Sequence, residues 1–356
     1  MAIIAFSASA ADKTWVDAAE CAQSALKQHY WNATTHVFRN RADRDDEAGK
    51  GFNYWWQAYA VTCVAQAVQR GSRVWAKADL AALREGILAR NGGHWTNDYY
   101  DDESWMACAM LDAAAATGEA AYRVVARKLW DDIHIAWNDN YGDGIPWRKT
   151  QLDYKNAPAN GPAIFIGAVL FQADRKADDL AQSQRIYEWL VKTLRDPQSG
   201  LIWDGINRTG KGTVDKAWRF TYNQGIFIGA CLELHRATHE ARYLADAERT
   251  GTAALDAFFA ANNGLCHEGG NGDGGLFKGI LVRHLATLAV ASPQLAPRIR
   301  SALEANGQRL AQLQGEHPDA LLPTTWDAGP APADLELSAH LSGTILMEAL
   351  IHREAR

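Results

Sequence analysis

The chain has 356 residues, of which 47% are hydrophobic and 22% are charged, and this composition excludes an intrinsically disordered protein. Its net charge is −6, whereas a nucleic-acid-binding protein typically carries a surplus of basic residues. No apolar run approaches the roughly 20 residues that span a bilayer. Fourteen Trp residues, against 11 Tyr and 10 Phe, indicate either an aromatic-rich core or a groove that stacks flat ligands.

The first eleven residues admit two interpretations. They are small and apolar, and Ala8-Ser9-Ala10 resembles the cleavage site of a secretory signal peptide, but a basic segment is missing and the stretch is short. Residues 1–11 are therefore either the remnant of a signal peptide, which indicates a secreted or periplasmic protein, or an apolar strap that leaves a cytoplasmic location open. No linker or low-complexity tract follows, so residues 12–356 are predicted to form a single domain.

Two kinds of helical segment alternate along the chain. Amphipathic helices, with one apolar and one charged face, are predicted at 15–30, 74–90, 122–137, 178–194, 242–259 and 296–313. Between them lie segments that start with polar, aromatic or glycine residues and continue as nearly all-apolar helices. These segments begin near Trp56, Asp102, Gly161, Gln224, Gly279 and Ser338. A helix that is apolar on every side must be buried on every side.

This alternation predicts an all-α fold. The starts of successive all-apolar helices lie 46 to 63 residues apart, which fits one helical hairpin per repeat. Six hairpins that close into a ring give an (α/α)6 toroid, with six inner helices inside six outer ones. An open solenoid would need polar-faced repeats at both ends, whereas the last helix, 341–350, is still strongly apolar.

The five cysteines show no C-x-x-C pair, which argues against a zinc ribbon and against a dense disulfide framework. Cys63, Cys108 and Cys231 lie in apolar helical runs and are predicted to be buried free thiols.

The loops that enter the all-apolar helices carry aromatic rings, amides, carboxylates and glycines, notably 51–57, 97–105, 155–162, 220–225 and 267–275. In a toroid these loops gather at one end and line a central cleft. Rings stack on the apolar faces of sugars, and carboxylates and amides hydrogen-bond the hydroxyls, so the cleft is predicted to bind carbohydrate. Eight Trp residues fall in or beside these segments: Trp55, Trp56, Trp95, Trp105, Trp147, Trp203, Trp218 and Trp326. Trp55 and Trp56 are predicted to contact sugar, and the other six to be scaffold.

Asp101 and Asp102 are the sharpest catalytic candidates. Two adjacent carboxylates at the mouth of an apolar helix repel each other, so one can hold its proton while the other stays ionised. Glycoside hydrolysis needs this division of roles. Since adjacent Cα atoms lie about 3.8 Å apart, the spacing favours the carboxyl separation of retaining enzymes, about 5–5.5 Å, over the roughly 6.5–9.5 Å of inverting ones.

A structural role for the pair is the competing interpretation, because acidic residues in a first helical turn complement the helix dipole and cap free N–H groups. The aromatic neighbours Tyr99, Tyr100 and Trp105 favour a functional site. Asp131-Asp132 and Asp178-Asp179 are also paired, but they lie on amphipathic helices and are predicted to be solvated or capping charges.

The glycine-rich segment 270–275 formally matches G-x-G-x-x-G, but no strand precedes it, so a dinucleotide site is rejected. It is predicted to be a pocket loop that lets Asp273 and Lys278 reach a substrate. A plain solvent loop is the alternative.

Taken together, five sequence blocks resemble glycoside hydrolase family 76, the endo-α-1,6-mannanases. They are Tyr-Trp-Trp-Gln (54–57), Tyr-Tyr-Asp-Asp-Glu-Ser-Trp (99–105), Asn-Ala-Pro-Ala-Asn-Gly-Pro (156–162), Tyr-Asn-Gln-Gly (222–225) and Gly-Asp-Gly-Gly-Leu-Phe-Lys-Gly (272–279).

The resemblance implies an (α/α)6 fold, retaining hydrolysis of α-1,6-linked mannan, and no metal or other cofactor. It implies that Asp101 is the nucleophile and that Asp102 is first the general acid and then the general base. It also implies a wall around the scissile sugar made of Trp55, Trp56, Tyr100, Asn160, Tyr222, Asn223, Asp273 and Lys278. The expected partner is an α-mannan oligo- or polysaccharide, and the protein is expected to be a monomer.

Three alternatives to an α-1,6-mannan hydrolase remain open from the sequence. The family includes fungal relatives assigned to cell-wall transglycosylation, so a mannan transglycosylase is one. Another toroid enzyme, such as a sugar epimerase or an unsaturated-uronide hydrolase, is the second, although an epimerase typically needs a central His pair and the pocket loops offer only His94 and His267. The third is a non-catalytic glycan-binding toroid, which would need the Trp residues but not the Asp pair.

Overall fold

The structure is a computed structural model that describes residues 10–45, 52–260, 263–315, 319–327, 329 and 331–351, and twelve α-helices dominate these ranges. The inner helices are α2 (Tyr54–Arg70), α4 (Tyr100–Thr117), α6 (Ala157–Asp174), α8 (Thr221–Thr238), α10 (Gly274–Ala291) and α12 (Leu337–Ile351). The outer helices are α1 (Ala10–Tyr30), α3 (Lys77–Arg90), α5 (Ala120–His134), α7 (Ala177–Leu194), α9 (Ala241–Phe258) and α11 (Ala296–Gln314).

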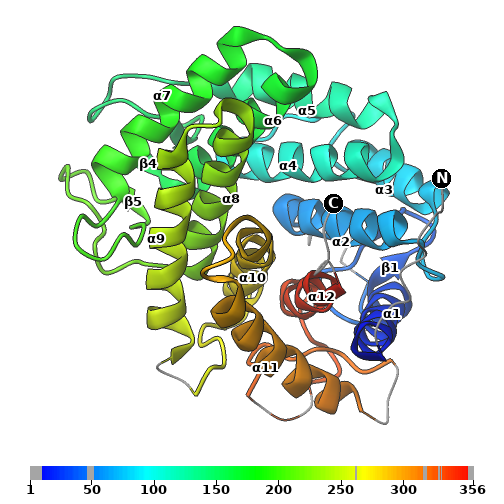
Figure 1. Ribbon diagram of the computed structural model, residues 1–356. Helices are drawn as coiled ribbons and strands as arrows, with labels where there is room; N and C mark the ends of the chain where they lie inside the picture. Colours follow the sequence, from blue (N-terminus) through cyan, green and yellow to red (C-terminus); the bar gives the residue numbers. More distant parts are fainter. Residues whose placement is uncertain are drawn as a thin grey trace, which may run out of the picture.

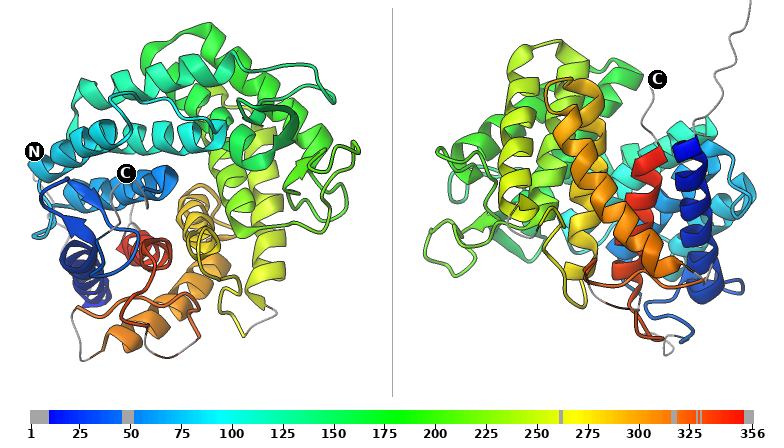
Figure 2. Two further views of the ribbon diagram at one scale, coloured as in Figure 1. Left: turned by 180° about the vertical axis from the view of Figure 1, so that it is seen from behind. Right: turned by 60° about the horizontal axis from the view of Figure 1, so that its bottom comes forward.

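The inner helices form a closed ring. Each contacts the next around the circle, and α12 returns to contact α2 (Figure 1). The outer helices pack around this ring, and the view from behind shows the same two layers (Figure 2). The predicted (α/α)6 toroid is confirmed, including the alternation of all-apolar inner helices with amphipathic outer ones.

Residue chemistry explains both kinds of helix. On outer helix α7, Ile186, Leu190 and Leu194 recur every four residues and are buried together. Inner helices are buried on nearly every side, and small residues let them approach one another closely. At Gly225 of α8, a Cβ atom would lie 2.7 Å from the Ile280 carbonyl oxygen of α10, so this contact requires glycine.

A buried polar cluster joins the two ends of the ring. Glu348 of α12 is fully buried and accepts hydrogen bonds from Arg70 of α2 (Nε to Oε2, 2.9 Å) and Gln23 of α1 (Nε2 to Oε1, 2.9 Å). Arg70 also contacts Glu20 of α1. The cluster therefore ties the last inner helix to the first helical hairpin.

Two small antiparallel sheets interrupt the helices and were not predicted. One contains β1 (Trp31–Asn32) and β2 (Val37–Phe38), and the other contains β3 (Pro146–Arg148), β4 (Gln151–Asn156) and β5 (Gly205–Ile206) in that order. Arg148 forms a bridge with Tyr99, and the Lys149 amide donates to the Asp98 carbonyl (2.9 Å). The β3–β4 hairpin therefore reaches the start of α4.

The prediction that Asp131-Asp132 and Asp178-Asp179 are solvated or capping charges is wrong for Asp179, and Asp132 is only partly exposed. Asp132 forms an ion pair with Lys149 (2.8 Å). Asp179 is buried and accepts hydrogen bonds from Arg127 (2.7 Å) and Trp130 (2.9 Å). Asp131 and Asp178 are exposed, as predicted. Asp179 turns inward because Arg127 and the Trp130 N–H of α5 lie within reach, whereas the Asp132 side chain stays 34% exposed beside Lys149.

The remaining sequence predictions concern the thiols, apolar helices and the N-terminus. All five cysteines are free, and Cys63, Cys108 and Cys231 are buried as predicted. Of the described helices, one, α10, has the length and apolar composition of a membrane-crossing segment; as an inner helix it packs between α8 and α12. Residues 1–9 of the N-terminal segment lie outside the described residues, and α1 begins at Ala10.

Candidate active site

A pocket of about 650 Å³ lies at the end of the toroid where the inner helices begin. Its walls come from the starts of α2, α4, α8 and α10 and from β3. The lining residues are Asn40, Phe52, Asn53, Tyr54, Trp55, Asn91, Asn97, Tyr99, Asp101, Asp102, Trp105, Trp147, Tyr222, Asp273 and Phe277. Acidic, amide and aromatic side chains thus converge at the predicted end of the fold.

Asp101 and Asp102 lie in the first turn of α4, and their carboxyl groups have different partners. Both oxygens of Asp101 accept hydrogen bonds: Oδ1 from the Asp102 amide (3.0 Å) and Oδ2 from Trp147 Nε1 (2.9 Å). Asp102 Oδ2 accepts one hydrogen bond, from Asn97 Nδ2 (3.3 Å). Donors to a carboxylate stabilise its ionised form, so this pattern favours the charge on Asp101.

The pKa shifts of the two carboxyl groups also favour the charge on Asp101. Burial raises the pKa of Asp101, and the hydrogen bonds from the Asp102 amide and from Trp147 oppose this effect. Burial also raises the pKa of Asp102 well above its usual range, and the nearby negative charges of Asp101, Asp273 and Glu103 raise it further. The shared proton of the pair therefore belongs on Asp102, which leaves Asp101 as the ionised member.

Glu103, which directly follows the two aspartates in the chain, forms a partly buried ion pair with Lys149. Glu103 is fully buried, and its Oε1 accepts hydrogen bonds from the Asn97 amide (2.7 Å) and from Lys149 Nζ (2.8 Å). Burial raises the pKa of Glu103 to about 7, against the opposing effects of Lys149 and the Asn97 amide. Lys149 comes from the β3–β4 hairpin, so the hairpin fixes the start of α4 through this ion pair.

The pocket contains four aromatic rings in mutual contact. Tyr222 and Phe277 stack with their centroids 3.9 Å apart and their planes 6° apart. Trp55 lies 6.5 Å from Trp105 and 6.3 Å from Phe277, and Trp105 lies 6.3 Å from Tyr222. Such a surface offers flat apolar faces beside the two carboxyl groups, an arrangement that suits the C–H faces of a sugar ring.

Three of the eight predicted wall residues line the pocket: Trp55, Tyr222 and Asp273. A fourth, Trp56, is joined to it, because Trp55 Nε1 (2.9 Å) and Trp56 Nε1 (3.0 Å) both donate to Asp273 Oδ1. The carboxylate of Asp273 therefore holds two indole rings in place.

The other four predicted wall residues are buried outside the pocket lining. The Ile145 N–H donates to Asn160 Oδ1 (2.9 Å) and Asn160 Nδ2 donates to the Ile145 carbonyl (2.8 Å), so Asn160 fixes the approach to β3. Asn223 donates to Asp204 (3.0 Å). Lys278 donates to the Thr324 carbonyl and lies over the Trp326 ring. Tyr100 packs under Lys149, whose Nζ is 5.3 Å from its ring.

Sequence reasoning missed three residues that contact the pair or its support: Asn97, Trp147 and Lys149. Trp147 was predicted to be scaffold, yet its indole contacts Asp101. The segment from Pro146 to Asn156 holds alternating apolar and polar residues around a Lys149-Thr150 turn, a hairpin pattern that was a usable signal. The residues of the hairpin alone do not indicate that it contacts Asp101 and Glu103, because these lie more than forty residues earlier in the chain.

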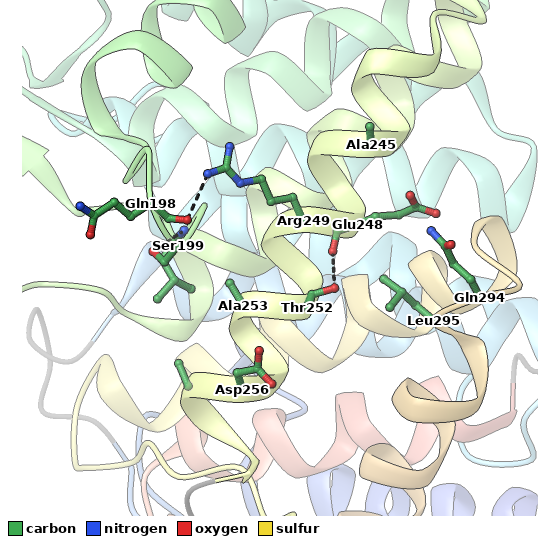
Figure 3. Close-up of a pocket in the computed structure, with 12 residues that line it drawn as sticks. Gln198, Ser199, Ala245, Glu248, Arg249, Thr252, Ala253, Asp256, Gln294 and Leu295 are labelled. Carbon is green, nitrogen blue, oxygen red and sulfur yellow. Dashed lines mark hydrogen bonds between the residues drawn. The ribbon is translucent and has the colours of Figure 1, made fainter.

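A second cavity, of about 730 Å³, lies on the outer surface beside α9 and the segment that precedes α11 (Figure 3). Its side chains form local contacts, such as Arg249 to the Gln198 carbonyl (3.3 Å), and it contains no adjacent carboxyl pair. Size alone therefore does not mark it as a reaction site. Among the residues that the structure describes, no group of three or more His, Cys, Asp or Glu is arranged to hold a metal ion.

Comparison with known proteins gives a match over nearly the whole chain. The sequence model described as Glycosyl hydrolase family 76 matches residues 14–356. Mannan endo-1,6-alpha-mannosidase DCW1 of Saccharomyces cerevisiae is 24% identical over 230 residues, which are 58% of this chain and 50% of that protein. The chain thus spans about half the length of this fungal relative.

Solved structures are similar over a greater length. The α-1,6-mannanase GH76A of Salegentibacter sp. HEL1_6 is 34% identical with a TM-score of 0.87, covering 96% of this chain and 100% of that one. An inactive variant of that enzyme, with two adjacent aspartates replaced by alanine, is in complex with α-1,6-mannotetrose (33% identity, TM-score 0.88, 96% and 99% coverage). A Listeria innocua protein is also 34% identical, with a TM-score of 0.86 over 94% of this chain and 96% of that one.

Proposed function

Because the chain belongs to glycosyl hydrolase family 76, we propose that it is an endo-acting α-1,6-mannanase that retains the configuration of the anomeric carbon. One observation carries the proposal: Asp101 and Asp102 lie side by side in an aromatic pocket, with two hydrogen-bond donors on Asp101 and one on Asp102. The names of its relatives, mannan endo-1,6-alpha-mannosidases and an α-1,6-mannanase, support the substrate and the mode of cleavage.

The proposed reaction has two steps. First, an Asp101 oxygen forms a bond to the anomeric carbon while the glycosidic C–O bond breaks and the Asp102 proton passes to the leaving oxygen. Then water attacks the anomeric carbon, gives its proton to Asp102 and releases Asp101. Two inversions give net retention, and both carboxyl groups return to their starting state.

Incubation with linear α-1,6-mannan tests the proposed activity. An endo-hydrolase releases new reducing ends and oligosaccharides of several lengths. Products longer than an oligosaccharide substrate would indicate transglycosylation, and binding without any product would indicate a glycan-binding protein. Failure to cleave or rearrange α-1,6-mannan, with the fold intact, would contradict the proposal.

The activity is expected to show a bell-shaped pH profile with both limbs shifted upward. kcat/KM falls at low pH as Asp101 gains a proton, and at high pH as Asp102 loses one. Since burial raises the pKa of both groups, the acidic limb is expected above the pKa of an ordinary Asp, about 3.9. Initial rates on α-1,6-mannotetraose across the pH range measure this, and an acidic limb near 4 would oppose it.

Trp147→Phe is expected to move only the acidic limb. The change removes the indole N–H that donates to Asp101, so the ionised form of Asp101 loses stabilisation and its pKa rises. We expect roughly a tenfold loss of kcat/KM below the optimum, the value of one hydrogen bond to a charged group. An unchanged acidic limb in a folded Trp147→Phe protein would show that this hydrogen bond does not affect the nucleophile.

The proposed substrate bears on where the protein acts. An intact mannan polymer does not cross a cytoplasmic membrane, so we propose that the protein acts outside the cytoplasm. The single chain supplies both carboxyl groups and the aromatic rings of the pocket, so the proposed reaction needs no second chain, and we propose a monomeric enzyme. Cell fractionation and sedimentation in solution test the two points, and a purely cytoplasmic protein or an obligate oligomer would oppose them.

A further inference from the structure

Asn97, in the loop before α4, is held by two contacts in addition to the one that it makes with Asp102. Its backbone N–H donates to Glu103 Oε1 (2.7 Å), and Glu103 is itself fixed by Lys149. Its side-chain Oδ1 accepts a hydrogen bond from the Tyr99 N–H (3.0 Å), which closes an Asx turn. The loop and the side chain are therefore both immobilised beside the catalytic pair.

These contacts determine which way the amide faces. Because the oxygen of the Asn97 amide accepts from Tyr99, the nitrogen must be the group that faces Asp102, and it donates to Oδ2 (3.3 Å). An amide nitrogen only donates, so the proton of a neutral Asp102 does not sit on the oxygen that faces it. Oδ1 is left as the protonated oxygen.

We infer that Asn97 is a positioning residue that assigns the proton of Asp102 to Oδ1, and so selects the oxygen that protonates the leaving group. The inference rests on the proposed function and adds to it a residue outside the predicted catalytic pair and sugar-binding wall. In the first step the Oδ1 proton passes to the glycosidic oxygen while Asp101 bonds to the anomeric carbon. Asn97 then stabilises the newly ionised Asp102 until that carboxylate takes a proton from water.

Two substitutions separate this role from a purely structural one. Asn97→Ser keeps an oxygen that accepts from the Tyr99 N–H, but its hydroxyl is too short to reach Asp102. Asn97→Ala removes both contacts. If the donor to Asp102 matters, both variants lose roughly tenfold in kcat/KM on α-1,6-mannotetraose. In both, the basic limb of the pH profile moves up by about one pH unit, because ionised Asp102 has lost its donor.

A purely structural role predicts a different pattern. Asn97→Ser would then match the wild type, and Asn97→Ala would lose activity with both limbs unmoved; either result overturns the inference. Asn32→Ala is the matched control. Asn32 Oδ1 accepts the N–H groups of Thr34 (3.0 Å) and Thr35 (3.1 Å) in a similar turn, and the residue is not among those lining the pocket. This control is expected to keep the wild-type profile.

A substrate with a good leaving group completes the test. A 2,4-dinitrophenyl α-1,6-mannobioside needs no proton from the enzyme in the first step. The first-step defect of both Asn97 variants, measured as the burst of dinitrophenol, should therefore largely disappear on it. A defect of equal size on both substrates overturns the inference.

The activity of Asp102→Ala, measured in parallel, separates a failure of the proposed function from a failure of the inference about Asn97. If it keeps near-normal activity on mannotetraose, the proposed function fails and the inference fails with it. If it loses that activity while the Asn97 variants keep wild-type pH limbs, the inference alone fails.

Discussion

Replacement of Asp101 by alanine is expected to lower kcat/KM on α-1,6-mannan by at least about 10⁴-fold, as expected for loss of a catalytic nucleophile. Asp102→Ala is expected to lose roughly 10²–10⁴-fold, the usual contribution of a general acid–base group. Both carboxyl groups lie in the aromatic pocket, and the one hydrogen bond that joins Asp101 to another element, from Trp147 of β3, is not alone. The Tyr99–Arg148 β-bridge and the Lys149–Glu103 ion pair also hold the β3–β4 hairpin to the start of α4. The variants should therefore keep the helical content and melting temperature of the wild type to within a few degrees.

Added azide distinguishes the roles of the two carboxyl groups. With Asp101→Ala, azide enters the space of the missing nucleophile and attacks directly, so an activated α-mannoside should give the β-azide. With Asp102→Ala, the intermediate on Asp101 still forms, and azide should give the α-azide. Asp131→Ala, an exposed carboxylate on α5, should behave as wild type. The opposite assignment of azide products would exchange the two roles.

Glu348→Ala is expected to lower the free energy of unfolding by about 3 kcal/mol or more. The change leaves the buried guanidinium of Arg70 without one of its two carboxylates and leaves Gln23 without its acceptor. These residues join α12 to α1 and α2, so the loss falls on the contact that closes the ring. Urea denaturation of the purified protein measures the change.

Glu188→Ala is the matched control for Glu348→Ala. Glu188 pairs with Arg242 on the outer surface, where both side chains are about half exposed. Exposed pairs contribute only about 0–1 kcal/mol. A loss of less than about 1 kcal/mol for Glu348→Ala would mean that the buried cluster does not hold the ring closed.

The helical framework could be predicted because its signal is local. A segment such as 163–171, apolar on every side, must be an inner helix, whereas 178–194, with one charged face, must cover it. The predicted start of the latter, Asp178, differs by one residue from that of α7. The sheets depend more on distant partners: β4 pairs with β5 about fifty residues further along the chain, and Arg148 of β3 bridges Tyr99 almost fifty residues earlier.

The sequence was enough to predict the two aspartates of the candidate site, but not the residues that surround them. Asp101 and Asp102 stand out because adjacent carboxylates rarely begin an apolar helix. The family resemblance also named Asn160 and Lys278, but in the structure Asn160 binds the backbone of Ile145 and Lys278 donates to the Thr324 carbonyl, so both side chains are engaged inside the scaffold. Which polar residue faces a cleft and which fixes a loop depends on the course of the backbone.

The same limit explains the residues that were missed. Asn97 reads as an ordinary loop residue until the structure places Glu103 and Tyr99 on either side of it. Trp147 lies some 45 residues beyond Asp101 in the chain, and only the β3–β4 hairpin brings its indole to that carboxylate. Asp132 reads as a solvated charge because its cation, Lys149, lies on the same hairpin.

The anomer that forms first shows whether Asp101 acts as a covalent nucleophile. Proton NMR, recorded within the first minutes of α-1,6-mannotetraose cleavage, resolves the anomeric signals of new reducing ends before mutarotation mixes them. Attack by Asp101 followed by attack of water predicts that the α-anomer appears first and the β-anomer only later. If the β-anomer appeared first, water would be attacking directly, and the assignment of Asp101 as a covalent nucleophile would be wrong.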